Sequence, residues 1–190
     1  MKRLILTFTL LTLSFPAMAA WQLDAQRSSL FFVSTKKNTV AETHHFDDIS
    51  GKYEQGQARL AIDLASVETN IDIRNERMQE HLFEVGDFAT ALVTVEVPEQ
   101  RVADLAPGDN LILDTTATLS LHGSEKPVDT VLSVTRLADD TIQVANLRPV
   151  IINAGDFGLA RGVEKLREIA GLPSISPAVP AQFTLYYTKR

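Results

Sequence analysis

The sequence predicts a mainly β protein, an antiparallel up-and-down β-barrel of about eight strands with two short helices. Apolar and polar residues alternate along most of the chain, which places every second side chain on the same face of a strand. Short breaks rich in turn residues separate these stretches, and only two stretches have a helical period. A closed barrel protects the sheet edges and is therefore favoured, while a β-sandwich is the rival fold that alternation alone does not exclude.

Residues 1–19 have the three parts of a secretory signal peptide. A positive n-region at Lys2 and Arg3 precedes an apolar h-region and an Ala-x-Ala cleavage site that ends at Ala19. The apolar run is too short to span a bilayer. We therefore expect an exported, periplasmic protein whose mature chain, residues 20–190, forms a single domain.

Charge and cysteine content narrow the class of protein further. Loss of the two cations of the signal peptide changes the formal charge from −6 to −8, which argues against a nucleic-acid partner because phosphates would be repelled. The 190-residue chain has no cysteine, so packing of the core must stabilise it without disulfides.

The predicted strands follow one another along the chain. Residues 21–36 come first, with Leu30 and Phe32 on one face and Phe31 and Val33 on the other. The remaining strands alternate between inward apolar residues and outward polar ones. They are residues 57–64, 91–97, 111–121, 128–134, 142–144, 150–152 and 183–187.

The clearest local signal is a β-hairpin over residues 119–134, where two alternating stretches flank a short polar break. Leu119 and Leu121 share one face of the first strand. Gly123 and Pro127 are expected to lie in the connection, since Gly tolerates a positive φ and Pro has no N–H for the ladder.

Two segments have a helical rather than a strand period, residues 74–85 and residues 159–170. Both are expected to pack an apolar face on the sheet. Their apolar positions are Met78, Leu82 and Val85 in the first segment, and Val163, Leu166 and Ile169 in the second.

Residue types that carry chemistry are few, and we expect neither a catalytic residue nor a metal site. His44 and His45 would point to opposite faces of a strand, and the chain lacks Cys, H-E-x-x-H and His-x-His motifs. The four histidines, His44, His45, His81 and His122, are interpreted as surface or loop residues. There is no G-x-S-x-G motif, and the paired aspartates occur in predicted turns.

One charged cluster could contact the head group of a ligand. Arg74 and Arg77 would be neighbours on a helix and could bind a phosphate or carboxylate together. The preferred interpretation is that they pair with Glu76 and Glu80 on a solvated face. Arg161 leaves the same two alternatives open.

Four motifs occur in order from residue 21 onwards. Together they resemble the motifs of the YceI-like family, exported proteins with a lipocalin-like barrel. Arg27 departs from a frequent His of that family, and residues 44–46 depart from its Gly-x-Phe. The motifs are Trp21-Gln-Leu-Asp24 with Ser28, Leu30 and Phe32; Ser66-Val-Glu-Thr69 with Arg74-Asn-Glu-Arg-Met78 and Leu82-Phe83; Leu119-Ser-Leu-His-Gly123 with Lys126-Pro-Val128; and Asp156-Phe-Gly158.

The resemblance implies an apolar tunnel that binds a long isoprenoid, such as a polyisoprenoid quinone or a polyprenyl compound, with its polar head at the mouth. We therefore expect a periplasmic carrier, not an enzyme, that needs no cofactor beyond the bound lipid. Transient contact with a membrane surface and a monomeric or homodimeric state are expected. The residues expected to contact the lipid are Phe32, Leu60, Ile62, Val93, Val95, Leu119, Leu132, Val134, Phe183 and Leu185.

Two other functions remain open at this point. An enzyme acting on a small hydrophobic molecule would need a polar group inside the barrel, where the inward positions offer mostly Thr115 and Thr130. A structural or stress-related protein would instead have a filled core. The volume of the cavity distinguishes this last function from lipid binding.

Overall fold

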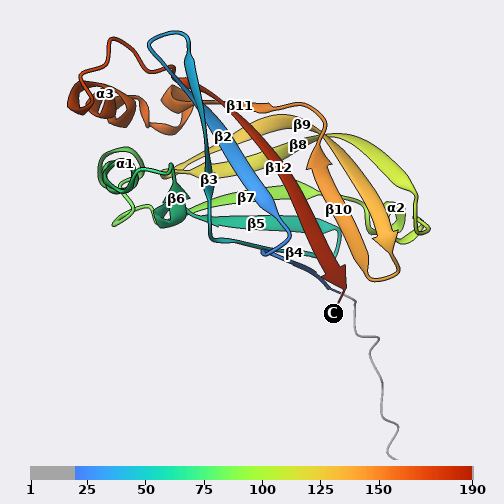
Figure 1. Ribbon diagram of the computed structural model, residues 1–190. Helices are drawn as coiled ribbons and strands as arrows, with labels where there is room; N and C mark the ends of the chain where they lie inside the picture. Colours follow the sequence, from blue (N-terminus) through green and yellow to red (C-terminus); the bar gives the residue numbers. More distant parts are fainter. Residues whose placement is uncertain (1–19, 190) are drawn as a thin grey trace, which may run out of the picture.

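The computed structural model describes residues 20–189, so the predicted signal peptide lies outside the described residues. The strands form a single 12-stranded sheet (Figure 1). They are β1 (Trp21–Leu23), β2 (Ser29–Lys36), β3 (Val40–Phe46), β4 (Ile49–Glu54), β5 (Gln57–Asp63), β6 (Val67–Glu68), β7 (Thr90–Glu96), β8 (Asn110–Leu121), β9 (Ser124–Ala138), β10 (Thr141–Asn146), β11 (Val150–Asn153) and β12 (Ala178–Lys189).

Eight of these strands form a closed antiparallel ring, in the order β1-β4-β5-β7-β8-β9-β10-β12, and pairing of β12 with β1 closes it. In the closing pair Trp21 lies opposite Lys189 and Leu23 opposite Tyr187. The predicted barrel is therefore confirmed, and the β-sandwich is excluded.

The four remaining strands continue strands of the ring. β1 and β2 are two parts of one run, interrupted at residues 24–28, and both pair with β12. The interruption at residues 47–48 divides β3 from β4 in the same way. The two runs lie side by side, since β3 pairs with β2 and β4 pairs with β1. The alternating pattern thus predicts the first run, residues 21–36, without its break, whereas the run of β3 and β4 is not among the predicted strands.

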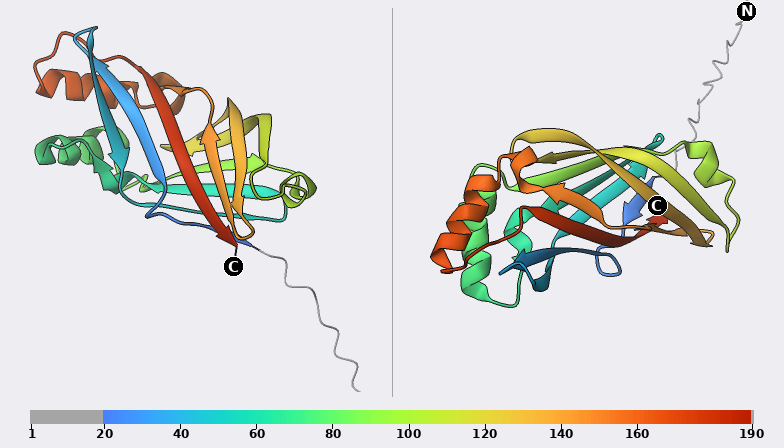
Figure 2. Two further views of the ribbon diagram at one scale, coloured as in Figure 1. Left: turned by 45° about the vertical axis from the view of Figure 1, so that its right-hand side comes forward. Right: turned by 90° about the horizontal axis from the view of Figure 1, so that it is seen from above.

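Short helices cover the two ends of the barrel (Figures 1 and 2). One end carries α1 (Asp72–Arg77), the π-helix η2 (Met78–Phe83) and α3 (Ala160–Ile169), which confirms the two predicted helical segments. The opposite end carries α2 (Glu99–Ala103), which the periodicity does not predict. The 3₁₀ turns η1 (Leu64–Ser66) and η3 (Ala154–Phe157) complete the helical elements of residues 20–189. None of the described helices is long and apolar enough to cross a membrane.

A glycine allows the two helical segments of the covered end to meet. A Cβ atom at Gly162 of α3 would lie 2.6 Å from the His81 carbonyl oxygen and 2.8 Å from Leu82 Cα of η2. Because these are backbone atoms, a larger side chain could enter only if the helices moved apart.

The β8–β9 hairpin is present, with His122 and Gly123 as its two-residue turn. Both have positive φ, 50° and 71°, as a type I′ turn requires. The prediction that Pro127 lies in the connection is wrong, since Pro127 lies within β9 opposite Thr118. Pairing of β10 with β9 extends only to Leu132, so this part of β9 has no strand on that side, and proline is tolerated there.

Candidate functional site

The barrel encloses an apolar cavity of about 260 Å³, counted as the space that water centres can reach. A single water needs only about 10–15 Å³ by this measure, so the void is far larger than the packing defects usual in protein cores. Its wall extends from Val97 and Val102 near α2 to Phe83 and Leu159 near the opposite end. The interior is therefore not filled by the protein's own side chains.

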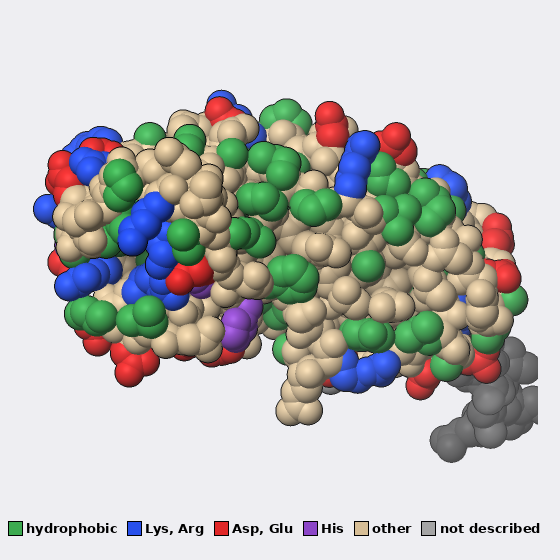
Figure 3. Space-filling model, turned by 45° about the horizontal axis from the view of Figure 1, so that its top comes forward, with side chains coloured by type: hydrophobic (Ala, Val, Ile, Leu, Met, Phe, Trp, Pro, Cys, Tyr) green, Lys and Arg blue, Asp and Glu red, His purple; other side chains and the backbone are tan. Residues whose placement is uncertain are grey.

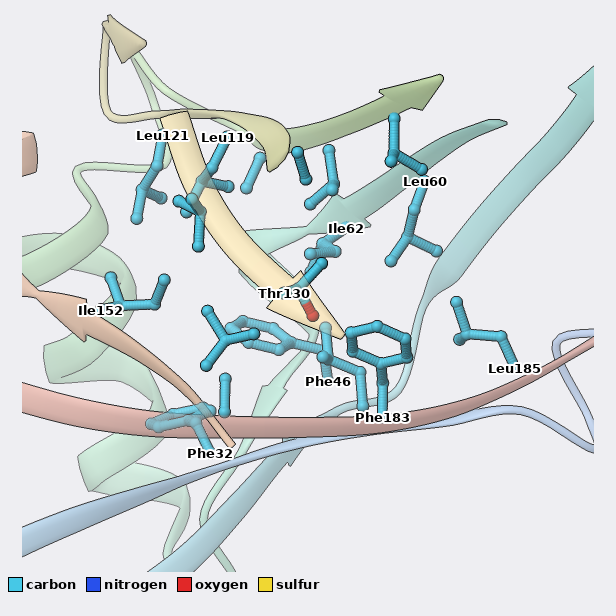
Figure 4. A pocket seen from close by; sticks show the side chains of 18 of the residues that line it. Phe32, Phe46, Leu60, Ile62, Leu119, Leu121, Thr130, Ile152, Phe183 and Leu185 are labelled. Atoms are coloured by element: carbon cyan, nitrogen blue, oxygen red, sulfur yellow. The ribbon is translucent and has the colours of Figure 1, made fainter. Parts of the chain in front are cut away.

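All ten residues that the sequence predicts as ligand contacts lie on the wall of this cavity; six of them are labelled in Figure 4. Their contact with a ligand stays a prediction. The sequence reasoning missed further lining residues, which come from the helical cap and from interrupted strands. They include Phe46, Tyr53, Leu82, Phe83, Leu159 and Val163. Leu82 and Phe83 belong to one of the family motifs, and that motif is the signal in the sequence that could have identified them as lining residues.

Apart from Arg59, the polar residues that line the cavity are uncharged. The Tyr53 hydroxyl donates to the Val97 carbonyl oxygen over 2.9 Å, and burial raises the pKa of Tyr53 to about 12. Burial also raises the pKa of Tyr187. Arg59 borders the cavity from an outward position of β5, where its Nε donates to Gln57 Oε1. Such a wall suits an apolar ligand and disfavours an ionic one.

Aromatic rings line the end of the cavity beneath the helices. The ring centroids of Phe32 and Phe46 lie 5.4 Å apart, and those of Phe46 and Phe83 lie 5.9 Å apart. The three residues come from β2, β3 and η2, so this contact joins the barrel wall to its helical cap.

The expectation that all four histidines lie on the surface is wrong for His44. Its ring packs edge-on against Phe32 and the residue is only 2% exposed. Its Nε2 hydrogen-bonds with Ser34 Oγ at 2.9 Å, and burial, followed by the charge of Arg74, lowers the pKa of His44. His45 lies on the opposite face, as alternation predicts, and bonds Asp47.

The described residues offer no metal site. No group of three or more His, Cys, Asp or Glu side chains within residues 20–189 could hold a metal ion. His122 instead bonds Glu84 at 3.0 Å.

The prediction that the arginines of this cluster pair with Glu76 and Glu80 is wrong for Arg74. Its Nη1 donates to Glu42 Oε2 on β3 at 2.8 Å, and its Nη2 donates to the Thr69 carbonyl oxygen at 2.5 Å. Lys36 on β2 pairs with the same Glu42 oxygen at 2.8 Å. The hydrogen bond from Lys36, together with Arg74, lowers the pKa of Glu42. Arg74 therefore joins α1 to the barrel wall.

Other motif residues also have structural roles. The Thr69 backbone N–H donates to Asn75 Oδ1 at 2.9 Å, and Asn75 Nδ2 donates to Glu68 Oε2 at 2.9 Å. These bonds fix the connection between β6 and α1, and Thr69 is almost completely buried.

An eight-stranded up-and-down barrel with helical caps and an enclosed apolar cavity defines the class of this protein. The chain matches the YceI-like domain across residues 21–186 and belongs to that family, which confirms the resemblance of its motifs.

Solved structures of two bacterial proteins, among others, are similar to this chain. A polyisoprenoid binding domain from Saccharophagus degradans, implicated in plant cell wall breakdown, is 46% identical over 91% of this chain and 99% of its own, with a TM-score of 0.88. BcnA from Burkholderia cenocepacia is 20% identical over 86% of this chain and 98% of its own, with a TM-score of 0.65, and supports the fold alone. No curated protein matches the chain.

Proposed function

We propose that this protein binds the chain of a long isoprenoid lipid inside its barrel and serves as a periplasmic carrier or store for that lipid. A polyisoprenoid quinone and a polyprenyl compound are the candidate ligands. The observation that carries the proposal is the unfilled apolar cavity, whose wall includes all ten predicted contacts. The 46% identical polyisoprenoid binding domain from Saccharophagus degradans supports the same class of ligand.

Burial of the chain is sufficient as a source of affinity. Transfer of a methylene group from water to an apolar site is worth about 0.8 kcal/mol, so several isoprene units gain binding free energy without any charged contact. The uncharged wall of the cavity fits this mode of binding.

A binding role is favoured over catalysis by the pKa values at the cavity wall. General acid–base catalysis works best with a group whose pKa lies near the operating pH. Burial instead moves the pKa values of Tyr53 and Tyr187 further from neutrality.

A carrier must collect its lipid from a membrane, and the helical end offers a surface for transient contact. Ile71 and Ile73, at the start of α1, are 47% and 50% exposed. Lys and Arg side chains gather at the same end of the molecule, among acidic neighbours (Figure 3). Export to the periplasm rests on the predicted signal peptide of residues 1–19.

A matched pair of tryptophan substitutions on β7 tests the proposed function. Val93 lines the cavity, whereas its neighbour Leu92 is 39% exposed on the outer face. Val93→Trp should fill the cavity and abolish binding of a polyisoprenoid quinone in a fluorescence titration, while Leu92→Trp should bind as the wild type does. Unchanged binding by Val93→Trp would contradict the proposal. Ala117→Leu, a smaller filling change on β8, should weaken binding if Val93→Trp does not fold.

A further inference from the structure

Thr130 places an unsatisfied hydroxyl group in the wall of the apolar cavity. It lies on the inward face of β9, between Val128 and Leu132, and the residue is 5% exposed. Its Oγ1 is buried beneath the cavity surface and has no hydrogen-bond partner among the described residues, and rotation about χ1, which exchanges the hydroxyl and methyl positions, would turn it toward the cavity. In Figure 4 the side chains shown are carbon throughout, except for the hydroxyl oxygen of Thr130.

An unsatisfied buried hydroxyl calls for an explanation, because nearly all buried polar groups in proteins have a partner. Valine has almost the same shape and would fill this position without the cost of an unpaired hydroxyl. Thr116, on the outward face of β8, shows the ordinary situation, since its Oγ1 donates to Asp129 Oδ1 at 2.7 Å. The hydroxyl group of Thr116 therefore has a hydrogen-bond partner, whereas that of Thr130 has none among the described residues.

A ligand is a better source of this partner than an ordered water. A buried water needs two to four polar partners, and the wall around Thr130 is apolar. The residue nearest in the sheet that could offer such a water a hydrogen bond is Thr115, directly opposite Thr130 on β8. A lipid oxygen needs only the one hydrogen bond, since the rest of the lipid is bound by apolar contacts.

We propose that the Thr130 hydroxyl group turns toward the cavity when an isoprenoid binds, hydrogen-bonds to a neutral oxygen of that lipid, a carbonyl or a hydroxyl group, and so sets the specificity of the cavity. This inference rests on the proposed function and makes it more specific. It places an oxygen of the ligand within the barrel rather than at its mouth. It favours an isoprenoid alcohol or quinone over a pure hydrocarbon, and over a diphosphate, whose charges the uncharged wall would leave unpaired.

Thr130→Val tests this inference when two ligands with the same carbon skeleton are compared. The probes are geranylgeraniol and the corresponding hydrocarbon without the hydroxyl group, titrated into the full mature chain. Thr130→Val should weaken binding of the alcohol about five- to tenfold, the range expected for loss of one net hydrogen bond. It should leave binding of the hydrocarbon unchanged. Thr130→Ser, which keeps the hydroxyl group, should retain most of the preference for the alcohol.

Thr116→Val is the matched control, since it removes an outward threonine hydroxyl group, and it should change neither affinity. An equal effect of Thr130→Val on both probes, or no effect on the alcohol, would overturn the inference and leave the proposed function in place. If neither probe nor a polyisoprenoid quinone binds the wild-type chain, the proposed function itself fails. Thermal unfolding of each variant, which should match the wild type or exceed it for Thr130→Val, verifies that the variants fold.

Discussion

Arg74 on α1 donates a hydrogen bond to Glu42 on β3, and the 2.8 Å contact joins residues that are 32 positions apart in the sequence. The side chains of Arg74 and Glu42 are 25% and 32% exposed, so the ion pair is partly shielded from water. It fastens the helical cap to the wall at the aromatic end of the cavity. Loss of this contact should therefore loosen the cap.

Arg74→Leu should lower the free energy of unfolding by about 1 kcal/mol, because it removes charge-assisted hydrogen bonds that are only partly screened by solvent. Urea denaturation provides the measurement. Arg77→Leu, on the same helix, is the control and should change stability less. Equal losses in the two variants would show that the Arg74–Glu42 contact has no special role.

Gly162→Ala should lower the free energy of unfolding by about 1–2 kcal/mol. Overpacking typically costs about 1–3 kcal/mol, and the higher helix propensity of alanine offsets part of it. The added Cβ would meet backbone atoms of η2 at 2.6 Å and 2.8 Å, which cannot move independently of that helix. Gly155→Ala is the control, since nothing lies within 4 Å of the position that its Cβ would occupy. A stability gain in Gly162→Ala would refute the close packing of α3 on η2.

His44 should make the stability of the fold depend on pH. Its pKa in the folded protein lies below the ordinary histidine value of 6.5, so the unfolded chain binds more protons on average as the pH falls through this range. The free energy of unfolding should therefore decrease as the pH drops below about 6.5, and the decrease should end below the pKa of the folded state. Burial is the largest cause of the lowered pKa of His44; the charges of Arg74, Lys36 and His45 lower this pKa further, and the charge of Glu42 raises it.

Urea denaturation at pH 7.5 and pH 5.5 measures this dependence. His44→Phe should reduce the difference between the two pH values, because the buried titrating group is gone. The exposed His45→Gln variant should keep most of the wild-type difference, because His45 is the smallest of the causes that lower the pKa of His44. The assignment to His44 would be wrong if His44→Phe retained it in full.

The face of each predicted strand could be read from the sequence, but the breaks between strands, and the run of β3 and β4, could not. A period of two assigns Leu60 and Ile62 to one face whatever their partners are, so the cavity wall follows directly from alternation. The interruption at residues 24–28 divides a run that pairs with β12 on both sides of the break, and the interruption at residues 47–48 divides β3 from β4, which pair with β2 and β1. Such pairing depends on residues far apart in the sequence, which a local pattern does not contain.

His44 and α2 show two other limits of the local pattern. Polar residues occupy both faces of β3, so alternation separates His44 from His45 without indicating which of the two is buried. The helix α2 has five residues, which is shorter than the 11-residue window that a helical period requires. The pairing of Arg74 with Glu42 was missed because helix spacing suggests only partners within the same helix.

Native mass spectrometry of the protein, purified from bacterial cells that express the full 190-residue sequence, tests the central claim most directly. Organic extraction of the same sample identifies whatever the barrel holds. We predict one isoprenoid lipid per protein, bearing a neutral oxygen and lost in the Val93→Trp variant. A barrel that is reproducibly empty, and that takes up no isoprenoid when one is offered, would contradict the claim.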